Sequence, residues 1–148
     1  MINLPKNLPR ADHVGSLLRP QALRRAHQQH AAREIDDAAL ENVVAACIAD
    51  AVRHQEPVGL QVITDGEFRR SSWHMDFMYQ IGGVQKVEQN ITVHFHSDQG
   101  DVDFKPSGLR VASKLNLDGC IFGDHFEFLK SVVGHGTPKL TIPSPSMI

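Results

Sequence analysis

The clearest pattern along the chain is a helical one between residues 40 and 52. Apolar residues recur there at spacings of three and four, which places them on one face of a helix. They are Leu40, Val43, Val44, Cys47, Ile48, Ala51 and Val52. Asp36 or Asp37 can cap the start of this helix, and Pro57 is expected to end it slightly early because proline disfavours helical geometry in the preceding residue.

Three short segments predict strands that alternate with helices. They are residues 11–15, 60–64 and 139–142. The β-branched residues of the second segment suit a buried strand. A helix predicted to begin near Pro20 and to run through "QALRRAHQQHAA" separates the first strand from the long helix. A last helix is predicted over "GDHFEFLKSVVG", with Asp124 as its cap, Glu127 as the capping-box partner and Gly134 as its stop.

A different pattern, with a period of two, lies between residues 84 and 117. Ile91, Val93 and Phe95 alternate with polar residues, which indicates a half-buried strand, and "DQGD" supplies a turn before the alternation resumes through residue 104. A further short strand is predicted over residues 110–117. We interpret this region as a hairpin inserted into a loop that follows a strand.

Composition indicates one soluble domain spanning residues 1–148, with 41% hydrophobic and 22% charged residues. A net charge of -2 without a basic stripe argues against a nucleic-acid partner. No apolar run reaches the ~18 residues of a spanning helix, and the N-terminus lacks the apolar core of a secretory signal, so we expect a cytoplasmic protein without membrane contact. Cys47 and Cys120 are far apart and predict free thiols.

Candidate chemistry gathers in "ITDGEFRRSSWHMDF", at the end of the second predicted strand. Taken alone, Glu67 with Arg69 and Arg70 could form only surface ion pairs. Trp73 and Phe77, four residues apart, could be core residues of a helix that begins near Ser71 or Ser72.

A second candidate lies in the inserted hairpin. His94 and His96 share one face of a strand and could in principle share a metal ion, but no third ligand is evident, so solvated histidines are the expected interpretation.

Four motifs occur in order along nearly the whole chain: "ADHVGSLLRP", a helix ending in "HQEPVGL", "VITDGEFRRSSWHMDF" and "TPKLTIPSPSMI". Together they resemble the cobalamin-independent methionine synthase family, in particular its short bacterial members built from a single catalytic barrel. The resemblance implies a TIM (β/α)8 barrel that transfers a methyl group to the thiol of homocysteine, with a zinc ion and with a methylated folate as the methyl donor.

The resemblance also implies roles for individual residues. Gly15 and Ser16 would bind the carboxylate of the substrate, and Glu67 would bind its ammonium group. The other residues expected around the same mouth are His13, Asp65 and Trp73, together with Asp12, Arg70 and His74, whose individual roles the resemblance does not define.

The chain also departs from the family pattern. The zinc ligands lie on later barrel strands, neither Cys47 nor Cys120 occupies a ligand position, and a whole barrel needs ~250 residues. We therefore expect an N-terminal portion: a partial barrel of about three βα units with the hairpin inserted at about 84–117. Such a portion would hold no catalytic residue or metal ligand, and would self-associate or bind a complementing C-terminal chain.

Two other functions remain open from the sequence. The first is a related enzyme that alkylates another small thiol, such as coenzyme M. The second is a non-catalytic remnant of the family or a binding module.

Overall fold

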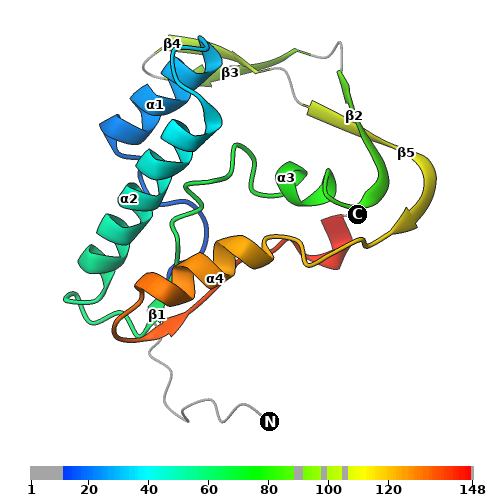
Figure 1. The fold of residues 1–148 in the computed structure, drawn as a ribbon. Helices are drawn as coiled ribbons and strands as arrows, with labels where there is room; N and C mark the ends of the chain where they lie inside the picture. The colour runs from blue at the N-terminus through cyan, green and yellow to red at the C-terminus, as the bar shows by residue number, and fades with distance from the viewer. Residues whose placement is uncertain (1–11, 89–91, 98–99, 105–106, 148) are drawn as a thin grey trace. The chain divides into compact units, whose positions relative to one another are not determined.

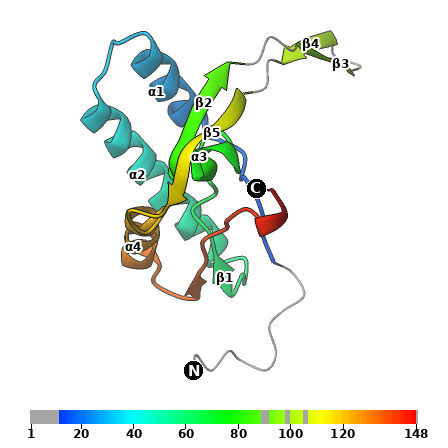
Figure 2. The same cartoon turned by 90° about the vertical axis from the view of Figure 1, so that its right-hand side faces the viewer.

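The computed structural model describes residues 12–88, 92–97, 100–104 and 107–147, which form a mixed α/β structure (Figures 1 and 2). The chain divides into two compact units. The first comprises the chain up to Trp73 together with Phe122–Ile142, and the second comprises His74–Ile121 and Pro143–Ile148. Among the described residues, no helix is both long and apolar enough to cross a membrane.

Three helices and one pair of short strands build the first unit. Helices α1 (Gln21–Ala31) and α2 (Asp37–Gln55) lie side by side, and α4 (Gly123–Val132) packs near the C-terminal half of α2 (Figure 1). Pro20 precedes α1 as predicted. The Asp36 carboxylate accepts the Ala39 N–H at 2.8 Å and caps α2, which confirms one of the two predicted caps.

The predicted apolar stripe of α2 forms the centre of the core of this unit. Side chains from all three helices, from the first strand and from the loop after it pack together. The buried members are Leu23, Val44, Ile48, Val52, Ile63, Phe68 and Leu129. Leu40, Cys47 and Ala51 of the same stripe pack against this cluster while partly exposed. The core therefore holds the loop after the first strand against α2.

Strands β1 (Val62–Ile63) and β6 (Thr137–Pro138) pair in parallel. The Thr137 N–H donates to Gln61 O at 2.7 Å, and the Lys139 N–H donates to Ile63 O at 2.8 Å. The predicted parallel pairing is confirmed, but the prediction that the last strand covers residues 139–142 is wrong. The carbonyl of Thr141 is bound by the guanidinium of Arg70 instead of a strand, so the ladder stops early.

The first predicted strand, residues 11–15, is also wrong where the structure describes it, from residue 12 onward. His13 Nε2 lies 2.9 Å from Gly15 O, and Gly15 has a φ of 90°, a left-handed conformation that interrupts extended pairing. Individual hydrogen bonds, and not a strand ladder, hold this part of the chain in place. The Leu17 N–H donates to Gly66 O at 3.1 Å, and the Lys139 ammonium donates to Asp12 Oδ1 and His13 O.

The second unit contains two antiparallel ribbons. Strand β2 (Gly82–Glu88) pairs with β5 (Ser107–Asn116), and β3 (Val93–Ser97) pairs with β4 (Gly100–Phe104). The unit also holds the short helix α3 (Met75–Met78) and a 3₁₀ turn, η1 (Pro145–Met147). The predicted hairpin is confirmed, whereas β2 was not predicted because its sequence, "GGVQKVE", begins with two glycines and alternates weakly.

Burial in this region corrects two further predictions. Strand β3 is not half-buried: Val93 and Phe95 are 36% and 55% exposed, because the ribbon has solvent on both faces at these positions. Ile91 lies outside the described residues. The helix expected from Ser71 or Ser72 begins only at Met75, and Trp73, which precedes it, is 49% exposed and is not a core residue.

The cap predicted for the last helix is wrong as well. Phe122, with a φ of 60°, occupies the capping position of α4, so Asp124 lies inside the first turn, where its charge still favours the positive end of the helix dipole. Glu127 accepts a hydrogen bond from Lys130 at 2.7 Å instead of closing a capping box. Gly134 does follow the end of the helix.

Candidate functional site

Buried polar side chains gather in the loop that follows β1. Thr64, Asp65, Glu67 and Arg70 are only 2–4% exposed. Burying such groups costs free energy unless hydrogen bonds replace those made with water. The partners of these side chains therefore show how the loop is held.

Gln55, the last residue of α2, holds the start of the loop. Its side-chain Nε2 donates to Thr64 O at 2.9 Å, and its Oε1 accepts the Thr64 N–H at 3.0 Å. The amide thus pairs with the backbone as a neighbouring strand would. Gly66 then turns the chain with a φ of 65°, and its N–H donates to Thr64 Oγ1 at 3.2 Å.

Glu67 has a left-handed backbone conformation, with a φ of 56°. A residue other than glycine pays on the order of 1 kcal/mol or more for this conformation, so the surroundings must stabilise it. Asp65 Oδ1 accepts the Glu67 N–H at 2.9 Å. Arg19 Nη2 donates to Arg70 O at 2.6 Å and to Glu67 O at 3.4 Å. The two side chains fix the backbone, and with it the direction of the Glu67 carboxylate.

The Glu67 carboxylate joins three segments that are distant in the sequence. Oε1 accepts a hydrogen bond from Thr141 Oγ1 at 2.7 Å, and Oε2 accepts one from Ser16 Oγ at 3.2 Å. Arg70 Nη1 lies 3.5 Å from Oε1. The structure therefore brings Ser16 and Glu67 into direct contact.

Arg70 is buried and contacts other residues of the same cluster. Its Nη2 donates to Thr141 O at 2.7 Å, and its guanidinium lies 4.4 Å from the centre of the Phe122 ring. A cation over an aromatic face is stabilised by the negative charge of that face. Arg70 thus fastens the segment after β6 to the loop after β1.

The remaining predicted residues fall into different surroundings. Gly15 and His13 shape the turn that presents Ser16, and Asp12 is held by Lys139. Asp65 acts on the backbone of Glu67 through the hydrogen bond given above. Trp73 is half-exposed at the end of the loop, and His74 belongs to the second unit.

Four residues of this cluster were not among the predicted site residues. They are Arg19, Gln55, Lys139 and Thr141. All four lie inside motifs that carry the resemblance, but nothing in their spacing indicates a shared partner. Gln55 offers one signal: it is a polar residue at the position where the apolar stripe of α2 would continue.

The described residues do not form a zinc site with three or more protein ligands. No three histidine, cysteine, aspartate or glutamate side chains among them are placed to hold a metal ion together. Burial, and next the charge of Asp50, raises the pKa of the Cys47 thiol and so disfavours the thiolate that zinc requires. Cys120 is a free, exposed thiol.

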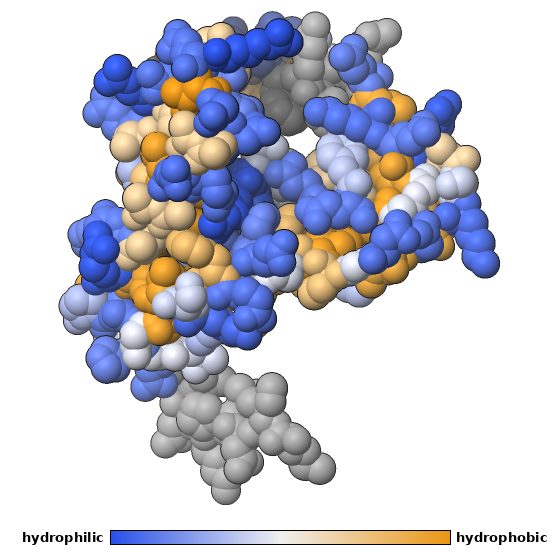
Figure 3. Space-filling model, in the orientation of Figure 1, coloured by the Kyte–Doolittle hydropathy of each residue, from blue (hydrophilic) through white to orange (hydrophobic). Residues whose placement is uncertain are grey.

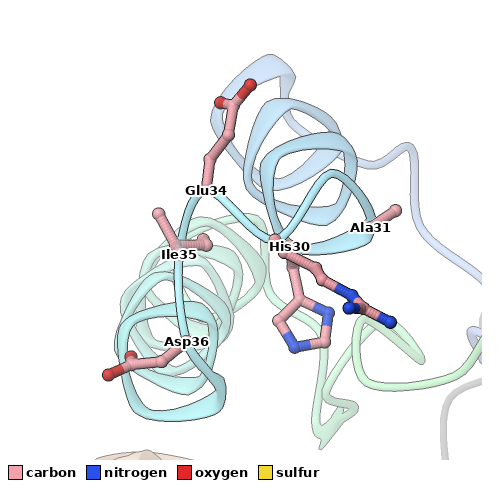
Figure 4. A pocket seen from close by; sticks show the side chains of 6 residues that line it. His30, Ala31, Glu34, Ile35 and Asp36 are labelled. Atoms are coloured by element: carbon pink, nitrogen blue, oxygen red, sulfur yellow. The ribbon is translucent and has the colours of Figure 1, made fainter.

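A separate hollow lies at the turn between α1 and α2. It is lined by His30, Ala31, Arg33, Glu34, Ile35 and Asp36. Figure 4 shows that the carboxylates of Glu34 and Asp36 point away from the His30 ring. Polar groups that diverge in this way do not converge on a ligand, so the Glu67 cluster is the better candidate site.

Comparisons with known proteins agree on one family. Residues 8–100 match the family model described as the catalytic domain of the cobalamin-independent synthases. YxjH of Bacillus subtilis is 40% identical over 139 residues, which cover 94% of this chain and 36% of that protein. A methionine synthase of Sulfolobus acidocaldarius is 29% identical over 138 residues, which cover 91% of this chain and 38% of that enzyme.

A solved structure gives the same result. It is a Listeria monocytogenes protein described as a vitamin B12-independent methionine synthase, 34% identical, with a TM-score of 0.72. The match covers 93% of this chain and 36% of that one. The chain thus spans little more than a third of the length of the relatives it matches.

Proposed function

Because the chain belongs to the cobalamin-independent methionine synthase family, we propose that it supplies the amino-acid-binding part of a site that methylates the thiol of homocysteine. The observation that carries the proposal is the contact between Ser16 and the buried Glu67 carboxylate. Following the family, a methylated folate is the methyl donor.

Glu67 would bind the ammonium group of the amino acid. A carboxylate can accept about four hydrogen bonds, and Thr141, Ser16 and Arg70 approach this one from three directions. One accepting position therefore remains for a substrate N–H. The side chain is 6% exposed, and an ionic hydrogen bond is stronger where water is largely excluded.

Gly15 and Ser16 would bind the carboxylate of the same amino acid. Ser16 is exposed, and its hydroxyl lies at the long distance of 3.2 Å from Glu67, so it can turn toward a substrate at little cost. The turn at Gly15 leaves open space around its Cα, which allows a ligand to approach the backbone closely. Opposite ends of one amino acid would thus contact neighbouring segments of the protein.

Zinc has a limited place in this proposal. In the family, zinc holds the substrate sulfur as a thiolate, which is the nucleophile that the reaction needs. The described residues do not form a zinc site with three or more protein ligands, so the role proposed for the residues around Glu67 is binding and orientation of the amino-acid end of the substrate.

We also propose that β1 and β6 are neighbouring strands of a (β/α)8 barrel, with residues 84–117 inserted in the connection between them. Parallel pairing through a long connection that contains a helix supports this arrangement, because barrel strands pair in this way. The position of Glu67 supports it too, because active sites of such barrels lie at the C-terminal ends of the strands.

The test is a binding measurement on Glu67→Gln. This change keeps the shape of the side chain but removes the charge that attracts an ammonium group. We expect isothermal titration calorimetry to show that the affinity for L-homocysteine and L-methionine falls about tenfold or more, since a charged hydrogen bond contributes roughly 1.5–3 kcal/mol. Glu127→Gln makes the same replacement at an exposed position of α4 and should leave both affinities unchanged.

Two outcomes would contradict the proposal. Equal affinities of wild type and Glu67→Gln for both amino acids would remove the role of Glu67. Binding of coenzyme M, which has no ammonium group, in preference to both amino acids would favour an enzyme of the same superfamily that alkylates another small thiol.

A further inference from the structure

The β3–β4 ribbon carries two histidine–aspartate pairs. His94 Nδ1 lies 2.6 Å from Asp103 Oδ1, and His96 Nδ1 lies 2.6 Å from Asp101 Oδ1. The pairs follow from the register, since His94 is directly opposite Asp103 and His96 is directly opposite Asp101. The spacing of the histidines in the sequence does not indicate these carboxylate partners.

All four side chains lie on one face of the ribbon. Residues two apart in a strand point to the same side, and directly opposite residues of an antiparallel pair share that side. The side chains of His94 and His96 are 64% and 81% exposed, and those of Asp103 and Asp101 are 65% and 68% exposed. Both imidazole rings are therefore open to solutes.

The carboxylates determine which ring nitrogen can bind a metal ion. A carboxylate accepts a hydrogen bond from Nδ1–H, so in the neutral ring the lone pair lies on Nε2. Histidine ligands of metal ions almost always donate their other ring N–H to a carboxylate, a carbonyl or water in this manner. Each of the two rings has this arrangement.

From these observations we propose that His94 and His96 together bind a divalent first-row transition metal ion through their Nε2 atoms. Neutral imidazole is a ligand that Zn²⁺, Ni²⁺ and Cu²⁺ accept well. The spacing suits two ligands of one ion, because residues two apart on a strand are separated by roughly 6.6 Å along it. Asp101 and Asp103 orient the rings and add negative charge beside the ion.

The inference goes beyond the proposed function, because all four residues belong to the second unit and none takes part in the Glu67 cluster. Two imidazoles fill only part of a coordination sphere, so water would complete it. The affinity should accordingly be lower than that of a structural zinc site with four protein ligands.

The experiment titrates the full chain with Zn²⁺ and separately with Ni²⁺, by calorimetry in a buffer that does not bind metals. His94→Ala and His96→Ala should each lower the affinity of the tightest site about tenfold or more. His54→Ala is the matched control. His54 is an exposed histidine 3.7 Å from Asp50 and lies on α2, outside the β3–β4 ribbon, so its removal should leave that affinity unchanged.

A second measurement identifies the ligands directly. Ni²⁺ broadens nuclear magnetic resonance signals close to it, and we expect the ring protons of His94 and His96 to broaden first among the nine histidines. Simultaneous broadening of all the histidines, or unchanged metal affinity in both alanine variants, would overturn the proposal. His94→Gln replaces His94→Ala if the alanine variant disturbs the ribbon.

Discussion

At the scale of single residues, the loop after β1 is held by side chains that replace missing backbone partners. Gln55 pairs with both the N–H and the C=O of Thr64, and Asp65 and Arg19 do the same for the backbone around Glu67. A two-residue strand cannot supply these hydrogen bonds through its ladder. The geometry at Glu67 therefore depends on a few buried polar groups, each of which matters more than a typical surface contact.

Gln55 provides the test at this scale. Gln55→Ala leaves the buried N–H and C=O of Thr64 without their partner, and an unsatisfied buried group costs about 1–3 kcal/mol. We expect the free energy of unfolding, measured with urea, to fall by about 2–3 kcal/mol. Gln80→Ala removes an exposed amide whose Nε2 donates to Asp76 O, and should change the free energy of unfolding by less than about 0.5 kcal/mol. Equal effects of the two changes would contradict this account.

At the scale of elements, the short strands are joined to the helices by specific contacts rather than by long ladders. Glu56, just after α2, accepts the N–H groups of Gly134 and His135 at 2.8 and 2.7 Å. These amides lie between α4 and β6, so one carboxylate ties the end of α2 to the entry of the last strand. The hydrogen bond from the His135 amide is the main reason that the pKa of Glu56 lies below its ordinary value of 4.5.

This contact predicts a dependence of stability on pH. Because the pKa of Glu56 is lower in the folded protein, its contribution is fully present above the unfolded pKa and is lost as the pH falls through the folded value. We expect urea unfolding to show a larger advantage of wild type over Glu56→Gln at about pH 6 than under acidic conditions, because the advantage is lost as the pH falls and the carboxylate becomes protonated first in the unfolded chain and then in the folded protein. A difference that does not change with pH would contradict this mechanism.

At the scale of the whole molecule, apolar side chains remain at the surface of the first unit. Val14 and Val58 are each 73% exposed and Leu18 is 93% exposed. Leu18 and Val58 also line an apolar hollow beside α2 together with Leu17, Cys47, Leu60 and Phe68. Figure 3 shows hydrophobic surface between hydrophilic patches on the side where α1 and α2 lie. Contiguous exposed apolar surface favours association.

We therefore predict that the chain self-associates through this hollow. Sedimentation velocity should show an average mass that rises with concentration, and Leu18→Ser combined with Val58→Ser should reduce the rise because it removes apolar area from the contact. Leu117→Ser, at a 67% exposed leucine of the second unit, is the matched control. A monomer at all concentrations, or an equal effect of the control, would contradict the prediction.

The sequence by itself determined the features that local chemistry controls. The apolar stripe of α2, an aspartate cap at Asp36 or Asp37 and the alternation of β3 depend on neighbours within a few residues, so their patterns could be recognised directly. The motifs around Ser16 and Glu67 likewise identified the family, because they preserve both residue type and order.

Only the tertiary structure decided which distant groups meet. The contacts of Thr141 with Glu67 and of Gln55 with Thr64 leave no periodic trace in the sequence, and the place where β6 ends depends on Arg70 binding a carbonyl 71 residues away. Burial of β3 was predicted incorrectly for the same reason, since alternation shows which side chains share a face but not whether anything covers it. Long-range packing and hydrogen bonding, rather than local preference, set these features.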